Sequence, residues 1–148
     1  MKYINGGVTA AGGFKASGIH CGIRKNHIKK DLAMIVSDVK CAAAAVYTTN
    51  LVKGAPLTVT KNHIADGYAQ AIICNSGNAN TCNANGIEIA EAMSDLVAQK
   101  TGISANDVVV ASTGVIGQPL NIEPIANAID ELKAGLSVNG SLDAEEAI

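Results

Sequence analysis

Residues 74–86 carry the most unusual group of side chains in this sequence. They include five asparagines separated mainly by small residues, namely Asn75, Asn78, Asn80, Asn83 and Asn85. Asparagine and glycine tolerate left-handed backbone conformations, and asparagine side chains form hydrogen bonds with nearby backbone groups. The stretch is therefore either a strongly capped turn between a strand and a helix, or a rigid polar loop at a strand's carboxyl end. Open α/β sheets bind ligands at that end.

A second loop, residues 111–120, also follows an apolar segment and offers groups suited to acyl chemistry. Thr113 supplies a hydroxyl and an amide, and Gly114 lets another group approach the backbone closely. Such donors at a strand end can stabilise the oxyanion that forms when a carbonyl group is attacked. On residue types alone, an ordinary strand-to-helix connection remains the simpler interpretation.

No other reactive side chains have the spacing of a known site. The sequence lacks the nucleotide-binding patterns GxGxxG and GxxxxGK, the GxSxG nucleophile elbow and the HExxH metal pattern. Its histidines, His20, His27 and His63, are scattered. The glycine pairs of residues 6–14 suggest a turn, and the basic run of residues 24–30 fits a solvated turn better than an anion site. We predict no metal site and no resident cofactor.

Alternating apolar runs and helical stripes predict an α/β chain that positions these loops. We expect strands at residues 32–36, 43–48, 57–60, 69–74 and 108–111. The last two are apolar almost throughout, as strands covered on both faces are. Helices are expected at residues 87–100, ended by Gly102, and 122–133, capped by Asn121 and ended by Gly135. Another helix is expected to begin at Ser141 or Asp143, so residues 1–148 are interpreted as one domain truncated at its C-terminal end.

Composition excludes several classes of protein. The chain has 148 residues, of which 48% are hydrophobic and 16% charged, so it is expected to fold around a core. A net charge of −2 and 3% aromatic residues argue against nucleic-acid binding. No apolar window of about 18 residues is present, so we expect no membrane span and a cytoplasmic location. Cys21, Cys41, Cys74 and Cys82 match no redox or zinc spacing and are expected to be buried, reduced thiols.

Several sequence blocks occur in an order that resembles one enzyme family. They lie at residues 6–10, 31–38, 46–50, 52–56, 75–80 and 112–117. The last two read Asn-Ser-Gly-Asn-Ala-Asn and Ser-Thr-Gly-Val-Ile-Gly, and the two in this order are specific. Over nearly its whole length the chain resembles the N-terminal part of ornithine acetyltransferase, also called glutamate N-acetyltransferase, of arginine biosynthesis.

The resemblance implies an α/β layered sandwich of buried sheets and helices, similar to the self-cleaving N-terminal-nucleophile fold and completed by a second chain. It implies a precursor that cleaves itself before an internal threonine, which then begins the β chain. That threonine takes an acetyl group from N-acetylornithine, releasing ornithine, and passes the acetyl group to glutamate. Some family members also accept acetyl-CoA. The two chains form an α2β2 assembly, with no nucleic-acid or membrane partner.

The resemblance also gives Thr113 and Gly114 the role of the oxyanion hole, with the loop at residues 75–80 supporting the site. An N-terminal α-amine can activate its own threonine hydroxyl because its pKa lies near neutrality. This chain contains no matching nucleophilic threonine, so we expect it to be inactive alone. Two alternatives stay open: a related self-processing aminopeptidase, and a non-catalytic α/β binding module that is stable without a partner.

Overall fold

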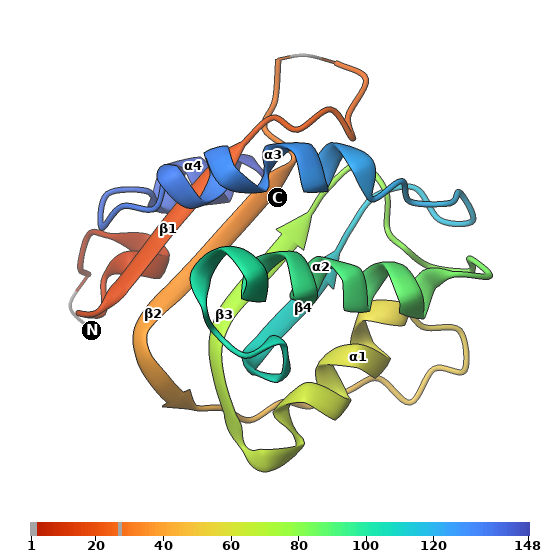
Figure 1. Cartoon of the computed structure of the whole chain (residues 1–148), viewed down its shortest axis with the longest axis horizontal. Helices are drawn as coiled ribbons and strands as arrows, with labels where there is room; N and C mark the ends of the chain where they lie inside the picture. The colour runs from red at the N-terminus through yellow and green to blue at the C-terminus, as the bar shows by residue number, and fades with distance from the viewer. Residues whose placement is uncertain (1–2, 27) are drawn as a thin grey trace.

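A four-stranded sheet organises the chain in the computed structural model, which describes residues 3–26 and 28–148 (Figure 1). The strands lie in the order β1 (Phe14–Ile19), β2 (Leu32–Ala42), β3 (Tyr68–Asn75) and β4 (Val108–Ser112). Strands β1 and β3 both run antiparallel to β2, whereas β4 is parallel to β3. The connection between β3 and β4 runs through helix α2 (Gly86–Thr101), because parallel neighbours require a crossover.

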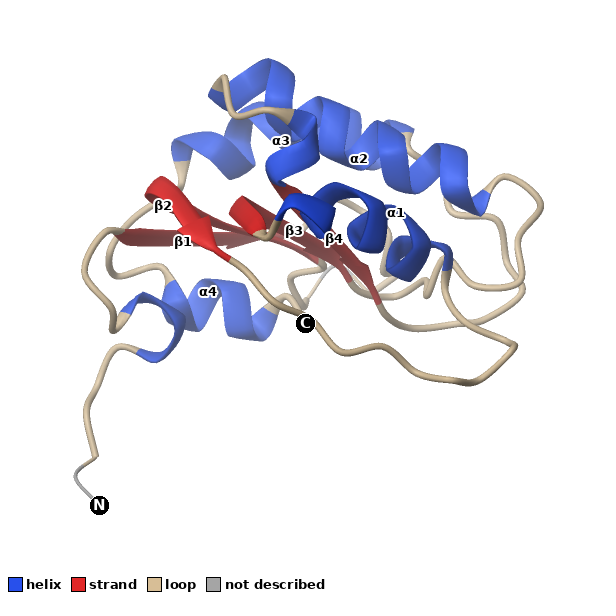
Figure 2. Ribbon diagram, turned by 90° about the horizontal axis from the view of Figure 1, so that it is seen from below, coloured by secondary structure: helices blue, strands red, loops and turns tan. Residues whose placement is uncertain are grey.

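Helices cover the two faces of the sheet unequally. Figure 2 shows α1 (Ala55–His63), α2 and α3 (Glu123–Ala134) together on one face, and α4 (Ser141–Glu146) on the other. In the part of the chain that the structure describes, no helix is both long and apolar enough to cross a membrane.

The main core lies between the sheet and the three-helix layer. Alternate residues of the strands point into it because side chains alternate between the faces of a strand. Its fully buried members include Leu32 and Met34 of β2, Ile73 of β3, Met93 and Val97 of α2, and Ile125 and Ile129 of α3. The stripe predicted for residues 87–100 is therefore buried through Met93 and Val97, while Ile87 stays 46% exposed.

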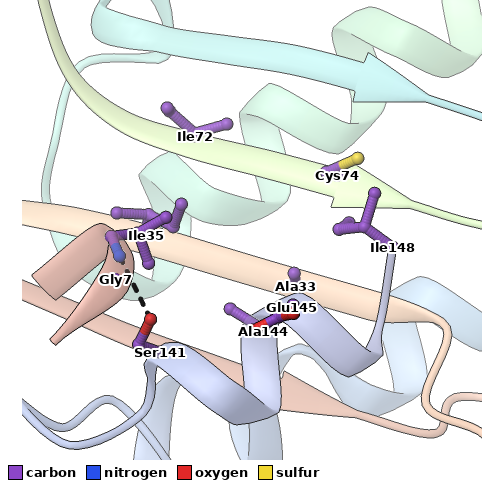
Figure 3. Close-up of a pocket in the computed structure, with 10 residues that line it drawn as sticks. Gly7, Ala33, Ile35, Ile72, Cys74, Ser141, Ala144, Glu145 and Ile148 are labelled. Atoms are coloured by element: carbon purple, nitrogen blue, oxygen red, sulfur yellow. Dashed lines mark hydrogen bonds between the residues drawn. The ribbon is translucent and has the colours of Figure 1, made fainter. Parts of the chain in front are cut away.

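The opposite face of the sheet is only partly covered. Helix α4 packs on β1 and β2 through small residues, namely Ala16, Ala33, Ala144 and Ala147. On the neighbouring β3, Ile72 remains 38% exposed. A cavity of about 280 Å³ opens between α4 and this part of the sheet, and its walls include Ile35, Ile72 and Cys74 (Figure 3). This face is therefore largely apolar and partly open.

Most of the predicted elements are confirmed. The predicted strands at residues 32–36, 69–74 and 108–111 lie within β2, β3 and β4. The predicted helices at residues 87–100 and 122–133 correspond to α2 and α3, and α4 begins at Ser141. Strand β1 was not predicted, because Ser17 and Gly18 interrupt its apolar pattern, although it pairs with β2 along its whole length.

Two predicted strands are wrong. Residues 43–48 have no regular structure, and Val46 is 99% exposed, because β-branched residues form a strand only where a partner strand is available. Residues 57–60 are part of α1, in which Pro56 occupies the first turn. The hydroxyl of Thr60 lies 3.0 Å from both the amide and the carbonyl oxygen of Val110. Helix α1 therefore satisfies groups on the outer edge of β4, as an edge strand requires.

The four cysteines, all among the described residues, form no disulfide with one another, and the expectation that they are buried is only partly correct. All four are free; Cys21, Cys41 and Cys74 are half-buried, and Cys82 is exposed. Burial, with the negative charge of Asp31 and a hydrogen bond to it, raises the pKa of Cys21 to about 12. Burial alone raises the pKa of Cys74 to about 11.

We therefore predict that iodoacetamide at pH 8 modifies Cys82 well before Cys21 or Cys74. Only the thiolate reacts, and a raised pKa keeps a thiol protonated until the pH approaches that value. Peptide mass spectrometry after timed labelling measures the three rates. Raising the pH from 8 to 10 should accelerate labelling of both Cys74 and Cys21, with Cys74 remaining the faster of the two because its pKa is the lower. Equal rates for Cys21 and Cys82 at pH 8 would contradict the prediction.

Candidate functional site

The two loops singled out in the sequence lie side by side because β3 and β4 are parallel neighbours. Their register pairs Asn75 with Ser112 at the carboxyl ends of the two strands. Beyond the strands, an isolated parallel bridge joins Asn78 to Val115. The asparagine-rich loop and the loop that contains Thr113 therefore form one unit at this edge of the sheet.

The buried amide of Asn75 holds the base of this unit together. Its Nδ2 donates a hydrogen bond of 2.9 Å to the carbonyl oxygen of Asn78. Its Oδ1 lies 2.6 Å from the hydroxyl of Ser112, which is also 2.9 Å from the same Asn78 carbonyl oxygen. Because Asn75 is fully buried, these partners replace the water that its amide loses on folding.

Asn78 and Asn80 fasten the rest of the loop. Asn78 donates from Nδ2 to the carbonyl oxygen of Gln118 at 2.9 Å, and its Oδ1 accepts a hydrogen bond from the amide of Asn80. Asn80 is fully buried with a φ of +43°, and its Nδ2 donates to the carbonyl oxygen of Gly86 at the start of α2. The stretch is therefore a hydrogen-bonded polar loop, whereas the strong cap of the other interpretation is absent, because Asn85 at the start of α2 makes no side-chain capping hydrogen bond. The strand-to-helix placement of the loop is confirmed. Ligand binding at this loop stays a prediction.

Gly114 is the point of closest approach between the two loops. Its φ is +131°, and a Cβ atom at this position would lie 2.4 Å from the carbonyl carbon of Gly77. The amide of Val115 donates to the carbonyl oxygen of Gly77, and the amide of Ala79 donates to that of Val115. The contact thus joins backbone to backbone, and only glycine satisfies both the conformation and the space.

Thr113 presents its hydroxyl rather than its amide. The amide donates a hydrogen bond of 3.0 Å to the carbonyl oxygen of Asn75, so it is occupied, contrary to the expectation that both groups are available. Among residues 3–26 and 28–148, neither the Thr113 hydroxyl nor the Gly114 amide has a hydrogen-bond partner. Both residues are exposed. The turn therefore offers two adjacent donors, one from a side chain and one from the backbone.

A cavity of about 290 Å³ lies next to this turn. Its walls come from the ends of β4 and of the asparagine-rich loop, from α1 and from the irregular segment before α1, and they include Tyr47, Leu57, Thr81 and Ser112. A volume of this size accommodates a small organic group.

The basic run is more than a solvated turn. Lys25 and Lys29 are exposed, as expected, but Arg24 is half-buried and its Nε donates a hydrogen bond of 2.9 Å to the hydroxyl of Ser76. His27 lies outside the described residues. Sequence reasoning missed the contact between Arg24 and Ser76 because it spans 52 residues.

The other histidines serve structural roles in the described part of the chain. His63 is buried, with Nδ1 2.9 Å from the carbonyl oxygen of Val108 and Nε2 3.1 Å from a carboxylate oxygen of Glu91. His20 lies 3.3 Å from the buried carboxylate of Asp31. Across the described residues, no three His, Cys, Asp or Glu side chains are grouped as metal ligands.

Known proteins of one kind match the chain. The ArgJ family model matches residues 15–148. The chain is 47% identical over 150 residues to the arginine biosynthesis bifunctional protein ArgJ of Symbiobacterium thermophilum, a match that covers 100% of this chain and 37% of that relative. It is 48% identical over 150 residues to the protein of the same name from Gloeobacter violaceus, with the same coverage. The chain thus spans about 37% of the length of these curated relatives.

Two solved structures have the same fold. One is the arginine biosynthesis bifunctional protein ArgJ of Bacillus halodurans, with a TM-score of 0.89 and 44% identity over 97% of this chain and 75% of that chain. The other is an ornithine acetyltransferase of Mycobacterium tuberculosis in complex with ornithine, with a TM-score of 0.90 and 34% identity over 96% of this chain and 78% of that chain. These likenesses confirm the expected α/β fold.

We predict that Gly114→Ala destabilises the fold more than Gly117→Ala does. Both glycines have positive φ, but a Cβ at Gly117 meets nothing within 4 Å, whereas at Gly114 it would collide with the backbone of Gly77. Strain alone costs about 1–2 kcal/mol, and overpacking at Gly114 adds roughly 1–3 kcal/mol. Chemical denaturation of the two variants measures the difference. Equal losses of unfolding free energy would show that the contact between Gly77 and Gly114 is not tight.

Proposed function

This chain belongs to the ArgJ family, and from that premise we propose that it supplies the oxyanion-stabilising part of an acetyltransferase. The enzyme would move an acetyl group from N-acetyl-L-ornithine to L-glutamate in arginine biosynthesis, in the cytoplasm. Family membership supports the acetyl-transfer chemistry. The name of the Mycobacterium tuberculosis neighbour, an ornithine acetyltransferase solved with ornithine, supports ornithine as the group that is released.

The observation that carries this proposal is the pair of free donors on the turn after β4. When a nucleophile attacks the acetyl carbonyl, the oxygen becomes negatively charged and needs hydrogen-bond donors that are already in place. The Thr113 hydroxyl and the Gly114 amide are adjacent, exposed and held on a rigid turn. The amide of Thr113 is excluded from this role by its bond to Asn75. Thr113 and Gly114 are thus our candidates for catalytic residues.

The nucleophile in this proposal is the N-terminal threonine of a second chain, made when the precursor cleaves itself. Its α-amine takes the hydroxyl proton while the oxygen attacks the acetyl carbon of N-acetylornithine. Collapse of the tetrahedral intermediate breaks the amide bond, ornithine leaves with the proton, and an acetyl-threonine ester remains. The amine of glutamate then attacks this ester and the ester C–O bond breaks. A proton of the attacking amine returns through the α-amine to the threonine oxygen, and N-acetylglutamate is released. Acetyl-CoA is proposed only as an alternative acetyl donor, and no step requires a resident cofactor.

The partly open face of the sheet supports a second chain as the partner. Ile72 is 38% exposed there, and the apolar cavity beside α4 lies on the same face. A layer packed on this face would bury apolar groups that otherwise contact water. We therefore propose that the two chains stay together, as an α2β2 assembly, and that this chain alone is inactive.

The composition of the assembly is tested by expressing the full-length precursor and recording its intact mass, with N-terminal sequencing of every chain. The proposal predicts two chains, of which the second begins with threonine, and acetyl transfer from N-acetylornithine to glutamate. A single uncleaved chain without transferase activity would contradict it. Release of amino acids from small peptides would instead favour the aminopeptidase alternative.

We further predict that Thr113→Ala in the two-chain enzyme lowers kcat by roughly 100- to 1000-fold, the effect of removing one oxyanion donor. The Michaelis constant for N-acetylornithine should change little, because the hydrogen bond from the Thr113 hydroxyl to the oxyanion forms in the transition state. Thr113→Ser, which keeps the hydroxyl, is the matched control and should retain most of the activity. Steady-state kinetics of the three proteins measure this. A change confined to the Michaelis constant would reassign Thr113 to substrate binding.

A further inference from the structure

A buried carboxylate organises the turn that backs the asparagine-rich loop. The side chain of Asp31 is fully buried, and it accepts hydrogen bonds from the amides of Cys21, Gly22 and Arg24 at 2.6, 3.2 and 2.8 Å. A buried carboxylate is costly without such partners, so residues 21–24 are fixed around it. The carbonyl oxygen of Asp31 also accepts the amide of Ser76 at 2.9 Å. One residue therefore ties this turn to the start of the asparagine-rich loop.

The side chain of Arg24 makes a second connection between the turn and the loop. Its Nε donates to the hydroxyl of Ser76, which in turn lies 2.6 Å from the carbonyl oxygen of Ala147. Ser76 is fully buried. The guanidinium group thus donates a hydrogen bond to a neutral hydroxyl inside the protein, instead of pairing with a carboxylate at the surface.

Gly77 lies between this turn and Gly114. A Cβ at Gly77 would lie 3.0 Å from Cγ of Arg24 and 3.1 Å from Cγ2 of Ile23. On its other side, the carbonyl carbon of Gly77 lies against Gly114, where a Cβ would approach to 2.4 Å. The chain of contacts from Asp31 through Arg24 and Gly77 to Gly114 thus leaves no room for a side chain at Gly114 and makes a side chain at Gly77 a tight fit against Arg24.

We propose that Arg24 and Asp31 are positioning residues for the oxyanion-stabilising turn, an inference that rests on the proposed function. The aliphatic stem of Arg24 lies beside Gly77, and the hydrogen bond from Nε of Arg24 to Ser76 keeps that stem in place. Gly77 in turn limits where the amide of Gly114 can lie. A shift of the donors by a fraction of an ångström weakens their hydrogen bonds to the developing oxyanion. It therefore destabilises the transition state more than the bound substrate. Neither residue needs to touch the substrate for this effect.

The test uses Arg24→Met in the full-length, two-chain enzyme. Methionine keeps much of the unbranched stem but removes the donor to Ser76. We expect kcat for acetyl transfer from N-acetylornithine to glutamate to fall about tenfold, with the Michaelis constant and the thermal unfolding midpoint nearly unchanged. Lys25→Met removes a neighbouring exposed cation and is the matched control, which should behave as the unsubstituted enzyme. A kcat of Arg24→Met equal to that of Lys25→Met would overturn the proposal.

Ser76→Ala provides a second arm: it removes the acceptor of the Arg24 bond, together with the bond of the hydroxyl to the carbonyl oxygen of Ala147, with a small change in volume. If Arg24 acts through Ser76, adding Arg24→Met to Ser76→Ala should lower kcat no further than Ser76→Ala does alone. Fully multiplicative effects, or a change confined to the Michaelis constant, would overturn the positioning role while leaving the proposed function intact. Absence of acetyl transfer by the unsubstituted enzyme would overturn the proposed function, and this inference with it.

Discussion

The parallel pairing of β3 with β4 is the constraint on which the candidate site depends. It places Asn75 opposite Ser112, so both loops leave the sheet at the carboxyl ends of these strands. The hydrogen bonds of Asn75 then extend the strand register into the loops, and the contact between Gly77 and Gly114 completes it. If β4 were antiparallel to β3, Thr113 would lie at the other end of the strands, far from every asparagine of the loop.

Strand β4 is the last strand of the sheet, so one of its sides has no partner strand, and helix α1 compensates for this. Helix α1 covers that edge, with Thr60 bonded to both backbone groups of Val110 and His63 beside the carbonyl oxygen of Val108. The same helix contributes to the cavity next to the exposed turn. The element that protects the sheet edge thus also shapes the space near the proposed oxyanion donors.

Local sequence patterns correctly predicted the elements whose apolar residues are spaced regularly along the chain. The apolar runs of β3 and β4 and the apolar stripe of α2 were recognisable because these side chains are buried against other apolar side chains. Residues 57–60 were not, because the role of Thr60 exists only against Val110, 50 residues away. The importance of Thr113 and Gly114 came from resemblance to a family, whereas the occupation of the Thr113 amide follows from a backbone contact with Asn75. Similarly, the charge pattern around Arg24 carries no information about its bond to Ser76.

The contact between Gly77 and Gly114 has a consequence for how this site can vary among homologous proteins. Because the two loops meet here through main-chain atoms, their relative position depends on backbone length as well as on the glycine at position 114. A residue inserted on either side of the contact would move one loop past the other and separate the bridge between Asn78 and Val115. Insertions should therefore be confined to segments beyond this bridge, such as the irregular stretch before α1. A change in loop length at this contact should therefore be tolerated as poorly as a side chain at Gly114.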